Sequence, residues 1–172
     1  MGQPTNINML SQFGFRLIIN RLPSVEYFIQ HINLPGLNLG AANQPTPFAN
    51  PVPYSGDLTF NDLSISFKLD EGLQNYMEIW EWMIGLGFPH DFGQYKDLME
   101  RNQALNPEKG ELYSNITLAI LDNKHNPKFE VMFEDCFPTM LSDIEFGSTD
   151  TTIQYLTANV TFKYTLYTIK KF

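Results

Sequence analysis

The sequence has few of the side chains that carry most catalysis and metal binding. Among its 172 residues there is one cysteine, Cys136, and there are three histidines, His31, His90 and His125. One cysteine cannot form an intrachain disulfide, and no pair of cysteines or histidines has the spacing of a zinc site. We therefore expect no metal, no cofactor and no disulfide framework.

These few reactive side chains do not combine into a catalytic set. Cys136 follows Asp135 at the end of an apolar segment, where burial disfavours the thiolate that a nucleophile needs. His90 is followed by Asp91, but adjacent residues rarely face each other as a base and its orienting acid must. We predict that the chain is not an enzyme and has no catalytic residue.

Basic residues and long apolar runs are also scarce. The 11 Lys and Arg stand against 19 Asp and Glu, which gives a formal net charge of −8. Specific binding to a phosphate backbone needs clustered basic side chains, and none are present. The apolar run at 83–88 is far too short to span a membrane. The opening residues lack the basic and apolar regions of a signal peptide, so synthesis in a cytoplasm is expected.

What the sequence does contain is a core-forming set of apolar residues arranged for strands. Hydrophobic residues make up 43% of the chain, enough for a single packed domain over residues 1–172. β-Branched and aromatic residues, or apolar residues alternating with polar ones, predict strands. The expected strands are 13–19, 25–34, 57–69, 114–121, 129–134, 140–147 and 156–166, with a turn at 122–127. Residues 89–112 are polar and mixed, and are expected to form a connection with at most a short helical turn at 95–102. The first two strands are expected to form one hairpin, and 114–121 with 129–134 a second.

One segment has helical periodicity. The helix is predicted over residues 71–85, with Asp70 as its N-cap and Gly85 and Gly87 near its end. Its apolar stripe is expected to hold Leu73, Tyr76, Met77, Trp80, Met83 and Ile84. Trp82 lies about 200° from Trp80 around the helix axis. Trp82 is therefore either a partly exposed aromatic or a residue that packs on an adjacent subunit.

Together these patterns predict a mainly β fold. Two packed antiparallel sheets, forming a β-sandwich or half-barrel, would carry one flanking α-helix.

Two stretches cannot be completed by this one domain. Residues 1–12 form a polar arm without periodicity, and residues 35–56 form a long proline-rich loop. The apolar residues of this loop would be poorly covered by a small domain, so a neighbouring subunit is expected to cover them. The predicted contact residues are Leu37, Leu39, Phe48, Val52 and Tyr54, together with Trp82.

The order of these features resembles the tail tube protein family of contractile-tailed bacteriophages. The likeness rests on the strand at 15–19, Leu34-Pro-Gly36, the Gly56–Asp62 segment before the alternating strand, the helix at 73–82, and the closing hairpin from 137–139 to Tyr167. It covers nearly the whole chain. Tube initiators, hub rings and the inner tube of type VI secretion belong to the same superfamily.

The resemblance implies a structural role in a virion, assembled in the host cytoplasm. Six copies would close a hexameric ring whose inner strands form a continuous barrel, and rings would stack into the tail tube. The terminal arm and the long loop would make the contacts between subunits and rings. DNA would pass through the lumen during ejection without specific binding, and acidic copies would repel its phosphates. Implied partners are the tail sheath, the baseplate hub or tube initiator, and the tape measure protein, with no membrane in the resting state.

Two alternatives stay open. Within the superfamily, the chain could be a tube initiator, a tail terminator or a baseplate hub ring, each of which ends a stack instead of extending it. A different class would be a small β-sandwich ligand-binding or hydrolytic module, which a stable monomer with a concave polar pocket would favour.

Overall fold

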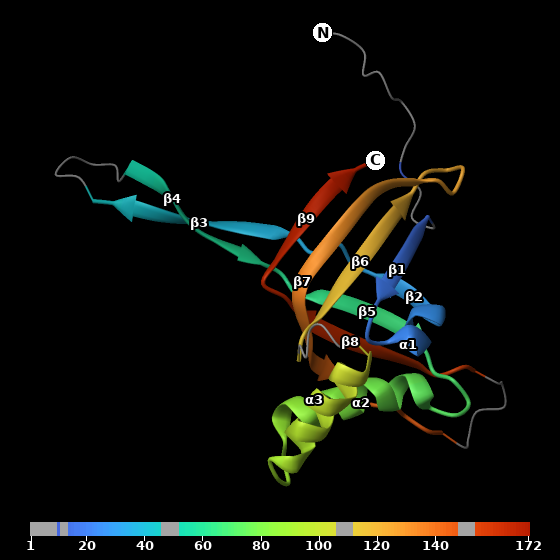
Figure 1. Ribbon diagram of the computed structural model, residues 1–172. Helices are drawn as coiled ribbons and strands as arrows, with labels where there is room; N and C mark the ends of the chain where they lie inside the picture. The colour runs from blue at the N-terminus through green and yellow to red at the C-terminus, as the bar shows by residue number, and fades with distance from the viewer. Residues whose placement is uncertain (1–9, 11–13, 46–51, 106–111, 148–153) are drawn as a thin grey trace.

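The computed structural model describes residues 10, 14–45, 52–105, 112–147 and 154–172. The fold is mainly β, as predicted, with nine strands and three helices in this part of the chain (Figure 1). The elements are β1 (Phe15–Ile19), α1 (Pro23–Tyr27), β2 (Ile29–Ile32), β3 (Leu37–Gln44), β4 (Val52–Phe60), β5 (Leu63–Lys68), α2 (Gln74–Gly87), α3 (Gly93–Leu105), β6 (Ser114–Leu121), β7 (Pro127–Leu141), β8 (Thr157–Lys163) and β9 (Leu166–Lys171).

The long strand β7 joins two antiparallel sheets. Its first part lies between β6 and β9, and its second part pairs with β8. The full order is β1-β6-β7-β8-β5-β2, with β9 paired to β7. Near the change of sheet, Asp135 has a φ of 54°, and the register with β6 shifts between Ser114 and Ile116. A bulge of this kind bends a strand, which allows one strand to serve both layers.

The core lies between these layers, where the predicted alternation is confirmed. Side chains of β5 and β8 that face the other sheet are fully buried, including Phe67, Val160 and Phe162. They meet buried residues of β1, β6 and β7, among them Ile116 and Phe133. Full burial of one such side chain is worth about 1.5–3 kcal/mol relative to exposure.

The predicted first hairpin is wrong. Residues 23–27 form the short helix α1, and only Ile29–Ile32 are a strand. Strand β1 pairs with β6 and β2 pairs with β5, so the two belong to different sheets. Pro23 explains the difference, because its fixed φ suits the first turn of a helix and it has no N–H to give a sheet.

The two C-terminal strand predictions are also corrected. Strand β7 ends at Leu141, and residues 142–147 form no strand. The continuous strand expected at 156–166 is divided into β8 and β9. Between them, the amide of Thr165 donates to the carbonyl of Glu134, where the chain passes from one sheet to the other.

The predicted helix exists with different ends. It covers Gln74–Gly87, and Asp70 does not cap it: Leu73 occupies the N-cap with a φ of 54° and no side-chain cap. The buried side chain of Asn75 fixes this end by donating to the carbonyl of Lys68 on β5. Gly85 lies inside the helix, where an added Cβ would be 2.8 Å from Leu98 of α3. Gly85 therefore permits close packing of the two helices and does not end α2.

The apolar face of α2 was assigned wrongly. Ile79 and Trp82 are buried, whereas Met77 and Trp80 are each 44% exposed. Residues 95–102, expected at most as a short helical turn, lie in the 13-residue helix α3, which packs on α2. The helix α2 thus has apolar contacts on two sides, and a single-stripe pattern could not predict its orientation. No described helix has the length and apolarity to cross a membrane.

Candidate assembly surface

The predicted irregular loop is largely a hairpin of two strands. Strands β3 and β4 pair with each other from Leu37 opposite Phe60 to Gln44 opposite Val52. They form a separate two-stranded sheet that extends away from the body of the molecule beyond β9 (Figure 1). All eight residues of β3 are exposed. A two-stranded sheet is only marginally stable alone.

The hairpin carries exposed apolar side chains. Leu39 and Leu58 are direct cross-strand partners and are 61% and 51% exposed. Leu37 and Tyr54 are also more than half exposed. Leu37 lies on the same face as the Leu39–Leu58 pair, whereas Tyr54, opposite Ala42, lies on the other face. Exposed apolar side chains on such an arm of a soluble protein indicate an interaction surface. We call these four residues, Leu37, Leu39, Tyr54 and Leu58, the hairpin patch.

The remaining predicted contact residues fall elsewhere. Phe48 lies outside the described residues, and so does the arm at 1–12 apart from Leu10, which is 65% exposed. Val52 is the first residue of β4. Trp82 is 1% exposed, so its side chain has no surface to present to an adjacent subunit. Sequence reasoning missed Leu58, although it lies in an alternating segment.

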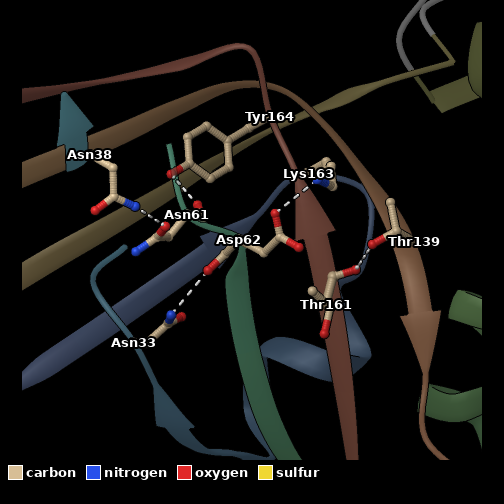
Figure 2. Close-up of polar contacts among 8 residues, drawn as sticks. All are labelled: Asn33, Asn38, Asn61, Asp62, Thr139, Thr161, Lys163 and Tyr164. Carbon is tan, nitrogen blue, oxygen red and sulfur yellow. Dashed lines mark hydrogen bonds and ion pairs between the residues drawn. The ribbon is translucent and has the colours of Figure 1, made fainter. Parts of the chain in front are cut away.

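Polar contacts fix the base of the hairpin to the sandwich (Figure 2). The side-chain amide of Asn38 donates to Asn61 Oδ1 at 2.8 Å, and the Tyr164 hydroxyl donates to the Asn61 carbonyl at 2.7 Å. The Asn33 amide donates to the carbonyl of Asp62 at 3.0 Å. These hydrogen bonds hold the segment that enters the hairpin before β3 and the segment that leaves it after β4 against the body of the protein. The direction in which the hairpin points is therefore set by its own subunit.

Aromatic packing adds to this anchor. The ring of Phe60, at the end of β4, lies edge-on to Tyr164 and Tyr167 with centroids 6.0 and 5.6 Å apart. The hydroxyl of Tyr167 donates to the carbonyl of Pro35 at 3.2 Å. The nearby Asp62–Lys163 ion pair, at 3.2 Å, is exposed and so contributes little.

The β3–β4 hairpin carries a single charged side chain, Asp57 of β4. No Asp, Glu, Lys, Arg or His occurs between His31 and Asp57, although the chain as a whole carries −8. Identical acidic copies repel one another. Up to Gly56, this arm can therefore contact another copy without bringing like charges together.

A second exposed apolar group lies where α2 meets α3. The rings of Phe88, Phe92 and Tyr95 contact one another with centroid separations of 5.3–5.9 Å. Phe88 and Phe92 are 43% and 58% exposed. This cluster was not predicted, because residues 89–112 were interpreted as a polar connection.

The candidate catalytic residues are not brought together. His31, His90 and His125 are exposed on β2, the α2–α3 connection and the β6–β7 turn. Cys136 is fully buried, and this burial raises the pKa of its thiol to about 12. Within the described ranges, no group of three or more His, Cys, Asp or Glu could hold a metal.

The state of Cys136 gives a measurable pH dependence. Between about pH 9 and 12 the unfolded thiol loses its proton while the folded one keeps it, so stability falls as the pH rises. The expected slope from this group is about 1.4 kcal/mol per pH unit. Urea denaturation across this range should show a steeper loss for the natural protein than for Cys136→Ala. The folded protein should also resist maleimide at pH 8, and equal slopes or rapid labelling would contradict the burial.

Comparison with known proteins agrees with this architecture. A family model described as phage tail tube protein matches residues 2–170. The tail tube terminator protein of Enterobacteria phage T4 is 27% identical over 146 residues, which cover 83% of this chain and 76% of that protein.

Solved structures share the fold. The tube-terminating cap of the anti-feeding prophage superposes with a TM-score of 0.66 at 13% identity, covering 99% of this chain and 96% of that one. The sheath–tube complex of an extracellular contractile injection system, called PVC, contains a chain with a TM-score of 0.65 at 11% identity. The match covers 95% of this chain and 93% of that one.

Proposed function

The chain belongs to the phage tail tube protein family, and we propose that it is a ring-forming subunit of a phage tail tube. Like its relatives, it is a structural tail component and not an enzyme. The observation that carries the proposal of a ring is the β3–β4 hairpin, which is anchored in its own subunit but leaves its apolar side chains uncovered.

Free sheet edges support assembly into a closed ring. Among the described strands, β1 pairs only with β6, β9 only with β7 and β2 only with β5. Each therefore has one edge of unpaired backbone donors and acceptors. Joining such edges between copies removes them by closure. A hexameric ring of this kind, stacked on others, would form a conduit for DNA in the virion.

Within this family, a terminator ring is the better supported role. The T4 relative is a tail tube terminator, and a tube-terminating cap shares the fold over almost its whole length. The second candidate is the stacking tube subunit, which the PVC sheath–tube match favours. Sheath and neighbouring tube rings would be the partners in either case. A baseplate hub contact, a tape measure protein and assembly in the host cytoplasm remain part of the proposal.

Imaging of the purified protein tests these roles. A terminator should form single rings that do not elongate when the concentration is raised, whereas a tube subunit should polymerise into hollow tubes. Negative-stain microscopy and sedimentation over a concentration series would separate the two. A protein that remains monomeric at every concentration would contradict both.

A further inference from the structure

A groove lies at the side of the molecule where β1 and β2 form the edges of the two sheets. It has a volume of about 840 Å³ and is lined by residues of β1, α1 and β2. Its apolar lining includes Leu17, which is almost fully buried, and Phe15, Ile29 and Ile32, which pack partly against the core. The groove is thus an opening between the layers that exposes the side of the core.

The two strands beside this groove are free to pair. Within the described residues, β1 is bonded only to β6 and β2 only to β5. An extended segment entering the groove could bury apolar side chains and bond to an open strand edge, as in β-strand addition. The charged groups among its lining residues are Arg16 and Glu26, of opposite sign, with the titratable His31 beside them. A segment with little charge would fit such a lining, because Arg16 and Glu26 leave no excess of one sign.

We propose that this groove receives the β3–β4 hairpin of an adjacent copy of the chain. The proposal rests on the ring-forming function inferred above and identifies the surface that the hairpin patch contacts. The hairpin supplies exposed Leu39 and Leu58, with Asp57 as its single charged side chain, and the groove supplies a partly open apolar floor between two unpaired edges.

The positions of the two surfaces support this pairing. The hairpin extends outward beyond β9, whereas β1, β2 and α1 lie at the opposite side of the sandwich (Figure 1). Because the base of the hairpin is anchored by Asn61, it points away from the groove of its own subunit. With the hairpin on one side of the subunit and the groove on the opposite side, copies would contact one another head to tail. Such a contact closes into a ring when the rotation between copies allows it.

Site-directed cross-linking tests the pairing. One chain would carry Leu39→Cys on the hairpin, and a second, with a fusion that changes its gel mobility, would carry Gln30→Cys beside the groove. After co-expression, a short bis-maleimide should join the two into a heterodimer of known size. The natural Cys136 is buried and should not react. In the control, Glu100→Cys on exposed α3 replaces Gln30→Cys.

The result separates this inference from the proposed function. A thiol pair held at an interface has an effective concentration in the millimolar range, so cross-linking at micromolar protein should be roughly 100-fold faster than for the Glu100→Cys control. Adding Leu58→Asp to the chain that carries Leu39→Cys should lower the cross-linking rate to that of the Glu100→Cys control. Rings that form while cross-linking stays at the control level would overturn the groove assignment alone. A protein without rings would overturn the proposed function as well.

Two other occupants would also give distinct results. A cross-link within a single Leu39→Cys/Gln30→Cys chain, at a dilution where no ring forms, would show that the hairpin reaches its own groove. A cysteine placed within residues 1–12 that reacts with Gln30→Cys, in place of the hairpin cysteine, would assign the groove to the N-terminal segment. Either result would overturn the proposed pairing.

Discussion

Replacing Leu39 and Leu58 together by aspartate is expected to abolish ring formation while leaving the sandwich folded. These residues are cross-strand partners on the hairpin, and both are more than half exposed in the single chain. Their substitution therefore removes little that stabilises the fold. In a ring, however, the same positions would be covered, and burying a carboxylate without a partner is strongly unfavourable.

The size of this effect can be bounded from general interface energetics. Truncating one central contact residue costs about 2 kcal/mol or more, which weakens association roughly 30-fold. A carboxylate at the same place adds its desolvation cost, and each copy in a ring would have one such defective interface. We expect rings to disappear at micromolar concentration, as measured by sedimentation velocity and negative stain. The far-ultraviolet circular dichroism and the urea midpoint should change little.

A control variant with the same change in net charge shows whether rings are lost because the hairpin contact is altered or because the whole chain is more acidic. Lys96→Glu on exposed α3 changes the net charge by −2, as the double aspartate variant does. If general repulsion between acidic copies were the cause, both variants would lose their rings. If the hairpin patch is the contact, Lys96→Glu should assemble normally. Normal assembly of the double aspartate variant would refute the role assigned to the hairpin.

The sequence predicts strands best where only one face of a strand is buried. In β5, the buried Leu63, Ile65 and Phe67 alternate with more exposed residues, and a period of two follows from that geometry. The turn from Asp122 to Pro127 was also predicted correctly, because Asp122 Oδ1 accepts from the amides of Lys124 and Asn126. Both features are local or depend on a single contact face, so a pattern along the chain is enough to find them.

The hairpin could not be predicted by the same argument. Every residue of β3 is exposed within this chain, so no buried face imposes an alternation. Its prolines and glycines favoured an irregular loop, although Leu37, Leu39 and Tyr54 were correctly identified as residues that one domain leaves uncovered. The composition thus predicted that these side chains are uncovered within one subunit, but it did not predict that the segment forms a two-stranded hairpin. The groove between β1 and β2 could not be predicted either. It depends on how the edges of the two sheets are arranged in space, and no pattern along the sequence encodes that arrangement.

The two tryptophans of α2 show why the contact residue Trp82 was chosen wrongly. A helix wheel places them on different faces, but it cannot say which face meets the sandwich. In the structure, the sandwich covers Trp82, whereas Trp80 lines the shallow groove between α2 and α3. The side opposite a predicted apolar stripe is thus the one most deeply buried.

Trp82 should therefore be among the most sensitive positions for stability. Its ring contacts Phe162, with centroids 6.0 Å apart, and its indole N–H donates to the carbonyl of Leu112 at 2.9 Å. The guanidinium of Arg21 lies 4.6 Å from the ring centroid and also donates to the Leu112 carbonyl. Trp82 thus connects α2, β8 and the segment before β6 through one buried side chain.

Trp82→Ala is expected to lower the free energy of unfolding by about 3–5 kcal/mol, because it leaves a large cavity beside Phe162. Trp82→Phe should lose less, since it keeps an aromatic ring and the Leu112 carbonyl retains its bond from Arg21. Trp80→Ala, at a position that is 44% exposed, should cost no more than about 1 kcal/mol. Urea denaturation followed by circular dichroism would rank the three variants. Equal losses for Trp80→Ala and Trp82→Ala would contradict the orientation of α2, and with it the placement of both helices against the end of the sandwich.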